Sequence, residues 1–158
     1  MINVSKSVLQ KALIAGFFSA FTIGVLTVLT YKSTLGYFIA GSFGSSMVLL
    51  FGFPESPFAQ PKNVFFGHLV SASVGVFFVN LIPLPIYISI AFAVGIGIFL
   101  MILLDVVHPP AGGNPILVII GSVSYDYLIF PVITGCIIII LLAIFINKLI
   151  LKKKYPLK

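Results

Sequence analysis

The chain has 158 residues, of which 60% are hydrophobic and 8% are charged, and its mean hydropathy is +1.25. This composition excludes an ordinary soluble domain and predicts one multi-pass, all-α membrane domain over residues 1–158. The net charge of +6 comes from nine basic residues, all of them lysine, against three acidic ones.

The lysines gather near the two ends of the chain. Two precede or begin the first apolar stretch, and five lie at the C-terminal end of the chain. This is the positive-inside pattern of membrane proteins rather than a nucleic-acid-binding surface. We therefore expect a cell (inner) membrane protein with both termini cytoplasmic and no nucleic-acid partner. The terminal lysines are Lys6, Lys11, Lys148, Lys152, Lys153, Lys154 and Lys158.

Four apolar segments are long enough to cross a ~30 Å hydrocarbon core as helices. They cover residues 8–31, 64–82, 87–107 and 128–151. The second of them carries small residues at four-residue spacing, which permits close helix contact. The last has so few polar residues that it is apolar all round, and we expect it to face lipid. The small residues are Gly67, Ser71 and Gly75.

Two shorter segments lie between these four. Residues 36–51 begin with small and polar residues and lead into a proline-rich loop, residues 52–63. Residues 109–121 begin with two prolines, which cannot continue a helix. Thirteen helical residues would reach only ~20 Å, whereas seven extended and six helical ones reach about 31 Å. We expect each short segment to be a broken span, although a re-entrant hairpin fits the length equally well.

The short segments also suggest an internal repeat. Residues 44–52 align without gaps on residues 113–121. Two repeats follow, about 8–82 and 86–150, each made of a long span, a broken span with a half helix, and a long span. Three crossings per repeat would make the second repeat an inverted copy of the first, as in many transporters. Apolar matches also arise by chance in membrane proteins, so the repeat is a hypothesis.

The two half helices would start near the bilayer midplane. A helix start offers unpaired N–H groups and a partial positive charge, and small residues let a ligand approach that backbone closely. Together they predict a binding site for a small anion. The alternative is that the glycines serve only tight helix packing. The residues expected at this site are Gly44, Ser45, Ser46, Gly112, Gly113 and Asn114.

His108 lies at the break of the second short segment, and His68 lies within a long span. Both are expected to bind the anion. His108 is also expected to couple its transport to a proton, oriented by Asp105 one turn earlier. The alternative is a loop at the membrane surface. The spacing of these residues is too unspecific for a metal site, so no metal or other cofactor is expected. The chain has no nucleophile elbow or phosphate loop and is not expected to be an enzyme.

Two stretches give the chain a family resemblance. Residues 108–112 read HPPAG, and residues 56–63 read SPFAQPKN, followed by Gly67 and His68. Both resemble signatures of the HPP family of integral membrane proteins. The resemblance implies four or five spans and, from plant and cyanobacterial members, nitrite transport. Lys62 stands where the family leads us to expect arginine, which keeps the charge but loses the planar fork.

We therefore expect a transporter or channel for a small anion, nitrite-like, embedded in the lipid bilayer. Pro61, Lys62 and Asn63 would form its cytoplasmic mouth. So short a chain encloses little volume, which favours a homo-oligomer. The alternative is a membrane subunit that transports nothing and whose small-residue stripes bind a partner protein.

Overall fold

The computed structural model describes residues 5–157, which form helices and connecting loops with no β-strand among them. Four helical segments are long and apolar enough to cross a membrane. They are α1 (Lys6–Lys32), α3 (Pro61–Leu81), α4 (Ile86–Leu103) and a final segment over Leu128–Ile150. The all-α membrane fold is thus confirmed, and the four segments fall where the hydropathy predicts them.

Helix α1 begins after Ser5, whose hydroxyl accepts a hydrogen bond from the Val8 N–H at 3.3 Å, an N-cap that satisfies one free donor of the first turn. It ends at Lys32, and only Thr22 and Leu26 along its length are buried. Most of its apolar surface is therefore left to face lipid.

The first short segment is extended before it becomes helical. Near its start the Phe38 N–H donates to the Thr30 hydroxyl at 2.9 Å, which ties the extended chain to the end of α1. Helix α2 (Phe43–Met47) continues without interruption into a π-helical turn, η1 (Val48–Gly52). The loop that follows contains a short 3₁₀ turn, η2 (Pro57–Ala59).

Helix α3 is the centre of the fold and packs against α4, α5 and the final segment. It begins at Pro61, since proline needs no hydrogen-bond acceptor in the first turn. Two of its glycines allow the close contacts. A Cβ on Gly67 would lie 2.7 Å from the His108 Cβ, and one on Gly75 would lie 2.9 Å from the Pro115 Cα. The predicted small-residue stripe is a packing surface.

The second short segment differs in detail from the sequence expectation. Residues 109–113 are not extended but form a 3₁₀ turn, η3 (Pro109–Gly113), followed by α5 (Asn114–Ile120). Five residues at ~2.0 Å and seven at ~1.5 Å reach only about 20 Å. The non-helical residues between α4 and Pro109 supply the remaining length.

The final segment consists of a π-helical turn, η4 (Leu128–Ile133), helix α6 (Thr134–Ile144) and a second π-helical turn, η5 (Phe145–Ile150). Part of this segment is buried within the protein rather than left to face lipid. Gly135 lies against the Phe43 ring and the Phe38 carbonyl, because a residue without a side chain lets the first short segment approach closely. Residues buried on this side include Cys136, Ile139, Ala143, Ile146 and Asn147.

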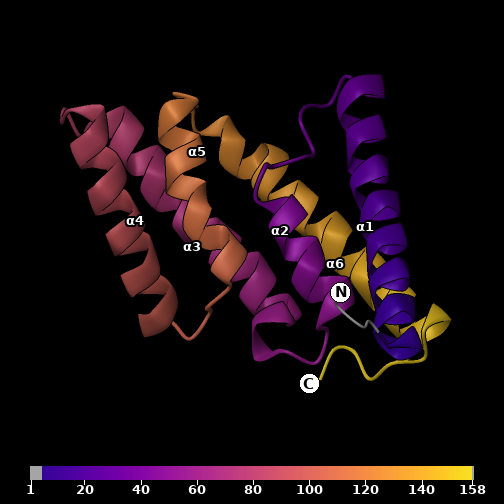
Figure 1. Ribbon diagram of the computed structural model, residues 1–158. Coiled ribbons are helices and arrows are strands. Elements are labelled where there is room, and N and C mark those ends of the chain that lie inside the picture. Colours follow the sequence, from indigo (N-terminus) through magenta and orange to yellow (C-terminus); the bar gives the residue numbers. More distant parts are fainter. Residues whose placement is uncertain (1–4, 158) are drawn as a thin grey trace.

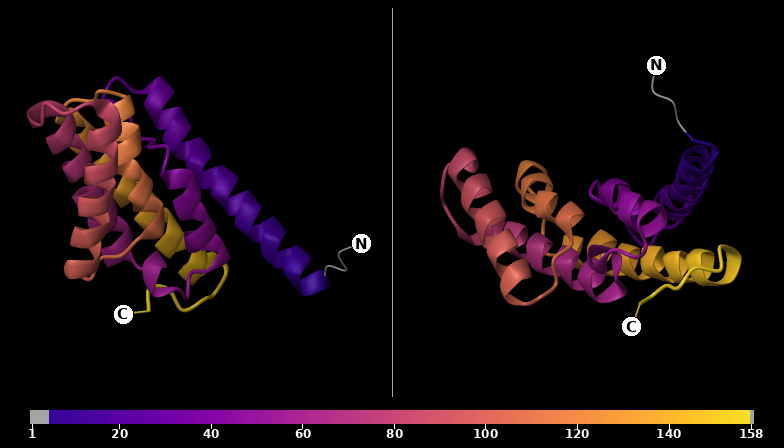
Figure 2. Two further views of the ribbon diagram at one scale, coloured as in Figure 1. Left: turned by 60° about the vertical axis from the view of Figure 1, so that its left-hand side comes forward. Right: turned by 60° about the horizontal axis from the view of Figure 1, so that its bottom comes forward.

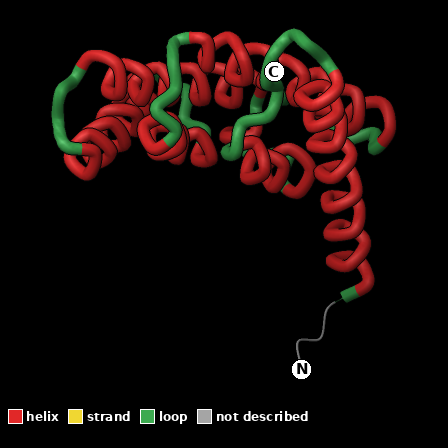
Figure 3. Tube along the Cα trace, turned by 90° about the horizontal axis from the view of Figure 1, so that it is seen from above, coloured by secondary structure: helices red, strands yellow, loops and turns green. Residues whose placement is uncertain are grey.

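The segments run alternately between the two ends of the bundle (Figure 1). The end of α1, the α3–α4 loop and the α5–η4 loop lie at one end, and both ends of the described chain, residues 5–157, lie at the other (Figure 1). Helix α3 and the final segment follow one another along one side, with α4, α5, α2 and α1 against them (Figures 2 and 3). The two short helices, α2 and α5, run in opposite directions. Each of the segments that contain them runs from one end of the bundle to the other and does not return to the end where it began (Figure 1). The relation of residues 8–82 and 86–150 as inverted repeats stays a prediction.

Candidate functional site

Four of the predicted site residues meet in one buried cluster. Ser46 comes from α2, His68 from α3, His108 from the turn before η3, and Asn114 from the start of α5. Each has 0 or 1% of its surface exposed. The broken spans thus bring together residues that lie up to 68 positions apart, from Ser46 to Asn114.

The Ser46 hydroxyl is the centre of this cluster. Its Oγ lies 3.0 Å from the His68 Nε2 and 2.9 Å from the His108 Nε2. The two imidazole rings face each other edge to face, with their centroids 4.9 Å apart. A single hydroxyl therefore joins two histidines that come from different halves of the chain.

Fixed partners hold the outer nitrogens of both rings. The His108 Nδ1 donates to the Phe58 carbonyl at 2.7 Å. The His68 Nδ1 lies 3.1 Å from the Asn114 amide nitrogen, which also donates to the His68 carbonyl at 3.2 Å. The Ser42 hydroxyl approaches the same Nδ1 at 3.4 Å. Sequence reasoning missed Ser42 and Phe58 as members of the site.

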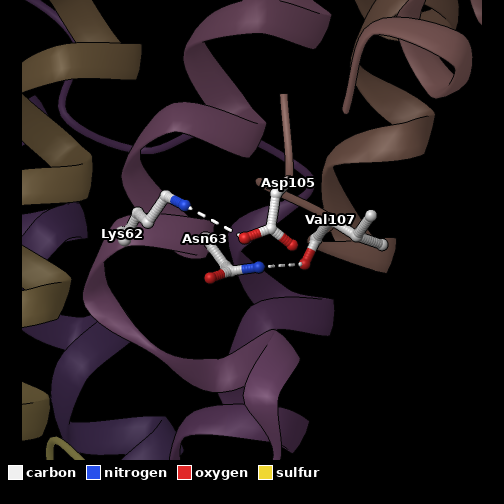
Figure 4. Close-up of polar contacts among 4 residues, drawn as sticks. All are labelled: Lys62, Asn63, Asp105 and Val107. Carbon is white, nitrogen blue, oxygen red and sulfur yellow. Dashed lines mark hydrogen bonds and ion pairs between the residues drawn. The ribbon is translucent and has the colours of Figure 1, made fainter. Parts of the chain in front are cut away.

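Asp105 does not contact His108, contrary to the expected pairing. The last helical residue of α4 is Leu103, and Asp105 has a positive φ of 54°, so no helical turn joins the two residues. Asp105 instead forms an ion pair with Lys62 at 3.2 Å, and its side chain is 96% exposed (Figure 4). The Phe58 carbonyl takes the orienting role that the sequence suggested for Asp105.

Pro61, Lys62 and Asn63, the residues expected to form a mouth, line a depression of about 600 Å³ at the end of the bundle where α1 begins and residues 151–157 lie (Figure 1). The Asn63 amide closes its inner side by donating to the Val107 carbonyl at 2.9 Å (Figure 4). Asp105 also lines the depression, together with Pro57, Gln60, Ile144, Pro156 and Leu157.

Residues 151–157 cross this end of the bundle and clasp the η2 loop. The Tyr155 hydroxyl donates to the Ala59 carbonyl at 2.8 Å, and the Leu157 N–H donates to the Gln60 side-chain oxygen at 2.9 Å. Burial raises the pKa of Tyr155, so the phenol stays protonated and can donate. These two hydrogen bonds therefore hold in place the loop that supplies the Phe58 carbonyl.

Gly44, Ser45, Gly112 and Gly113 lie outside the buried cluster. A Cβ added to Gly44, Gly112 or Gly113 would meet nothing within 4 Å, so tight packing does not explain these glycines. Phe43 and Ser46 donate their N–H groups to the Ala40 and Ser42 carbonyls. Between them, the exposed N–H groups of Gly44 and Ser45 have no acceptor among residues 5–157.

The second half helix offers fewer donors. Pro109, Pro110 and Pro115 have no N–H group. The 3₁₀ turn satisfies others, since the Ala111 N–H donates to the His108 carbonyl at 2.9 Å and the Asn114 N–H to the Ala111 carbonyl. The repeat suggests two equivalent helix starts, but the starts of α2 and α5 differ in their free donors. The free donors belong to the first half.

The family model for the HPP transmembrane region matches residues 4–156. The chain belongs to the HPP family. Two transmembrane proteins of Dictyostelium discoideum are similar to it, one 35% identical over 146 residues and the other 34% identical over 143. Each match covers 84% of this chain and 46% or 50% of the relative, so the chain spans about half their length. No solved structure matches the chain.

The two stretches that carry the resemblance contact each other in this HPP protein. The Phe58 carbonyl from SPFAQPKN accepts from His108, the first residue of HPPAG, and Asn63 bonds to the residue before it. A cluster of this kind can hold, orient and exchange a proton and can donate hydrogen bonds. Within residues 5–157, no three His, Cys, Asp or Glu side chains lie close enough together to hold a metal ion.

Proposed function

We propose that this HPP protein carries a small anion, nitrite-like, across the cell membrane. The observation that carries the proposal is the pair of free N–H groups at Gly44 and Ser45, which start a helix partway along the bundle. Such a start attracts an anion without any fixed charge. Lys62 is the only basic residue between Lys32 and Lys148, which fits binding by backbone donors.

The buried cluster adjoins these donors, since Ser46 follows Ser45 directly. A histidine that gains a proton there would offset the charge of an anion bound nearby. A Cβ added to Gly112 or Gly113 would meet nothing within 4 Å, which leaves space beside this stretch for a small ion. We place the anion between residues 44–45 and residues 112–113, and the proton on the histidines.

Uptake of a panel of anions into proteoliposomes tests the proposal. Nitrite, nitrate, formate and chloride are supplied separately, and we expect nitrite or an ion of similar size to enter fastest. Ser45→Leu and Gly113→Leu should abolish uptake, because each places bulk in the open region without a clash at its Cβ. Gly16→Leu and Gly95→Leu are matched controls in helices α1 and α4, where a Cβ also meets nothing within 4 Å.

Folded protein with lost uptake in both site variants, and normal uptake in both controls, supports the proposal. Normal uptake by Ser45→Leu and Gly113→Leu would remove the site. A purified protein that moves none of the four ions would favour a membrane subunit without transport activity. Native mass spectrometry of the same preparation tests the homo-oligomer that we expect.

The orientation is part of the proposal. Both ends of the described chain and Glu55 lie at one end of the bundle and Lys32 at the other. The lysine distribution makes the first end cytoplasmic. Single cysteines at positions 32 and 55, in a Cys136→Ala background, should react from outside and inside respectively with a reagent that does not cross membranes. Reaction of position 55 from outside would reverse the orientation.

A further inference from the structure

We propose that Ser46 is a hydroxyl relay between two neutral histidines, and that the pair takes up one exchangeable proton, on His108. The purpose of this proton rests on the proposed anion transport, but its position follows from hydrogen bonding alone. The deduction starts at the Phe58 carbonyl, which can only accept. Because it lies 2.7 Å from the His108 Nδ1, that nitrogen must carry a hydrogen.

A neutral imidazole has one N–H and one lone pair, so the His108 Nε2 must accept. Its partner at 2.9 Å is the Ser46 hydroxyl, which therefore donates to it. A hydroxyl has a single hydrogen, so toward His68 the Ser46 Oγ can only accept. The His68 Nε2, 3.0 Å away, must then carry the hydrogen of that ring.

The last nitrogen completes the chain. The His68 Nδ1 is left as an acceptor and faces the Asn114 amide group at 3.1 Å, which has a hydrogen to donate. The second hydrogen of that amide bonds to the His68 carbonyl at 3.2 Å, which fixes which end of the amide faces the ring. One direction of donation thus runs from His68 through Ser46 and His108 to Phe58, and both rings are neutral.

The cluster has one place for a further proton. A proton added to the His108 Nε2 would face the Ser46 oxygen, and the Ser46 hydroxyl could turn to the Ser42 carbonyl at 3.3 Å. The Ser46 Oγ would then accept from both rings, and no covalent bond other than the new N–H forms or breaks. The structure already contains the acceptor that this rotation needs.

The alternative position, the His68 Nδ1, has no such acceptor. A hydrogen there would point at the Asn114 NH₂ group, which cannot turn its oxygen toward the ring without placing it against the His68 carbonyl. Two charged rings with centroids 4.9 Å apart would repel each other. The cluster therefore takes one proton, and His108 receives it.

The other ionisable side chains in the region of the cluster do not bond to the two histidines. Lys62 and Asp105 pair with each other, and Tyr155 bonds to Ala59. Cys136 packs in the apolar core beside α2, and Glu55 is exposed on the loop. None of them forms a hydrogen bond to either ring, so the two histidines set their protonation through each other.

Nitrogen-15 NMR of histidine-labelled protein tests the inference, because the chain contains only two histidines. His68→Gln and His108→Gln assign the signals. At neutral pH we expect His108 to carry its hydrogen on Nδ1 and His68 on Nε2. On acidification only one ring should become doubly protonated, and it should be His108. The opposite tautomer in either ring, or His68 titrating first, would overturn the inference.

Ser46→Ala adds a second measurement. It removes the hydrogen-bond partner that the two Nε2 atoms share among residues 5–157, so the Nε2 signals of both rings should shift, whereas Asn114 and Phe58 still hold the two Nδ1 atoms. Ser73→Ala, on the same helix as His68 but facing an apolar groove, should leave both signals unchanged. Unchanged Nε2 signals in Ser46→Ala would show that Ser46 is no relay. If that variant does not fold, the parent spectrum alone decides.

These spectra need no transported ion, so they separate the relay from the proposed function. Fixed tautomers together with no anion uptake would leave the relay intact and overturn the proposed function. In proteoliposomes that take up the anion, proton entry measured with a trapped pH-sensitive dye should be lost in Ser46→Ala and kept in Ser73→Ala. Uptake with no accompanying proton entry in the parent would show that the cluster does not serve coupling.

Discussion

Replacing Gly67 by alanine tests whether His108 is held against α3 as the structure shows. The added Cβ would lie 2.7 Å from the His108 Cβ and 2.9 Å from the Val106 carbonyl oxygen. Neither neighbour is the end of a flexible side chain, and comfortable contacts need ~3.5–4.0 Å. The backbone around His108 must therefore move by about 1 Å, and overpacking of this kind costs about 1–3 kcal/mol.

Gly95→Ala is the matched control, because Gly95 lies inside α4 and a Cβ there would meet nothing within 4 Å. A helix-interior alanine is favoured over glycine by about 0.8–1 kcal/mol. Gly67→Ala gains the same propensity but loses more in packing. We expect the first variant to be at least as stable as the parent, and the second to be less stable than the parent by up to about 2 kcal/mol.

Denaturant titration of the detergent-solubilised protein, followed by circular dichroism, measures both free energies of unfolding. The histidine NMR signals of Gly67→Ala should shift as well, because His108 is displaced from Ser46. Equal stability of the two variants would refute the reasoning, since it would mean that the turn before η3 does not pack against α3. Lower stability of both would point to a general intolerance of alanine rather than to the contact with His108.

Three further outcomes are expected. His108→Gln should flatten the pH profile of anion uptake, which in the parent should rise as pH falls because a protonated histidine accompanies the anion; an unchanged profile in initial-rate measurements would show that His108 serves structure only. Asn147→Ala should cost about 1–3 kcal/mol in the same denaturant titration, because it leaves the buried Leu50 carbonyl, now 2.9 Å from the Asn147 amide, without a donor. Tyr155→Phe should cost about 1 kcal/mol through the lost bond to Ala59 and should speed hydrogen exchange in the η2 loop; exchange as slow as in the parent would mean that the clasp does not hold the loop.

The long helices could be predicted from sequence because length and hydropathy alone define a membrane span. The break at His108 was equally visible, since adjacent prolines exclude a continuous helix. The buried face of the final segment could not be predicted, because apolar residues on all sides leave no periodic pattern. Only Gly135 hinted at the contact, and a single glycine does not reveal which helix approaches it.

Sequence reasoning named four residues of the buried cluster, but it missed Ser42 and Phe58 and did not predict how the four are connected. His68 and His108 were singled out separately, and nothing in their spacing placed Ser46 between them. The Phe58 carbonyl has no side-chain signature and becomes visible only when the loop is folded. Asp105 was assigned to His108 on the assumption of a continuing helix, and the positive φ of that residue sends its side chain to solvent instead.

Residues 151–157 are hydrogen-bonded to the η2 loop, which contacts His108. In a longer chain, these bonds would connect that loop to a domain that follows residue 157. The similar Dictyostelium proteins are about twice as long as the region they share with this chain. Leu157 is bonded to Gln60, only two residues from Phe58. A domain or affinity tag joined after Leu157 would be linked to the η2 loop through this hydrogen bond. Tags for functional work are better placed at the N-terminal end, where α1 is mostly exposed.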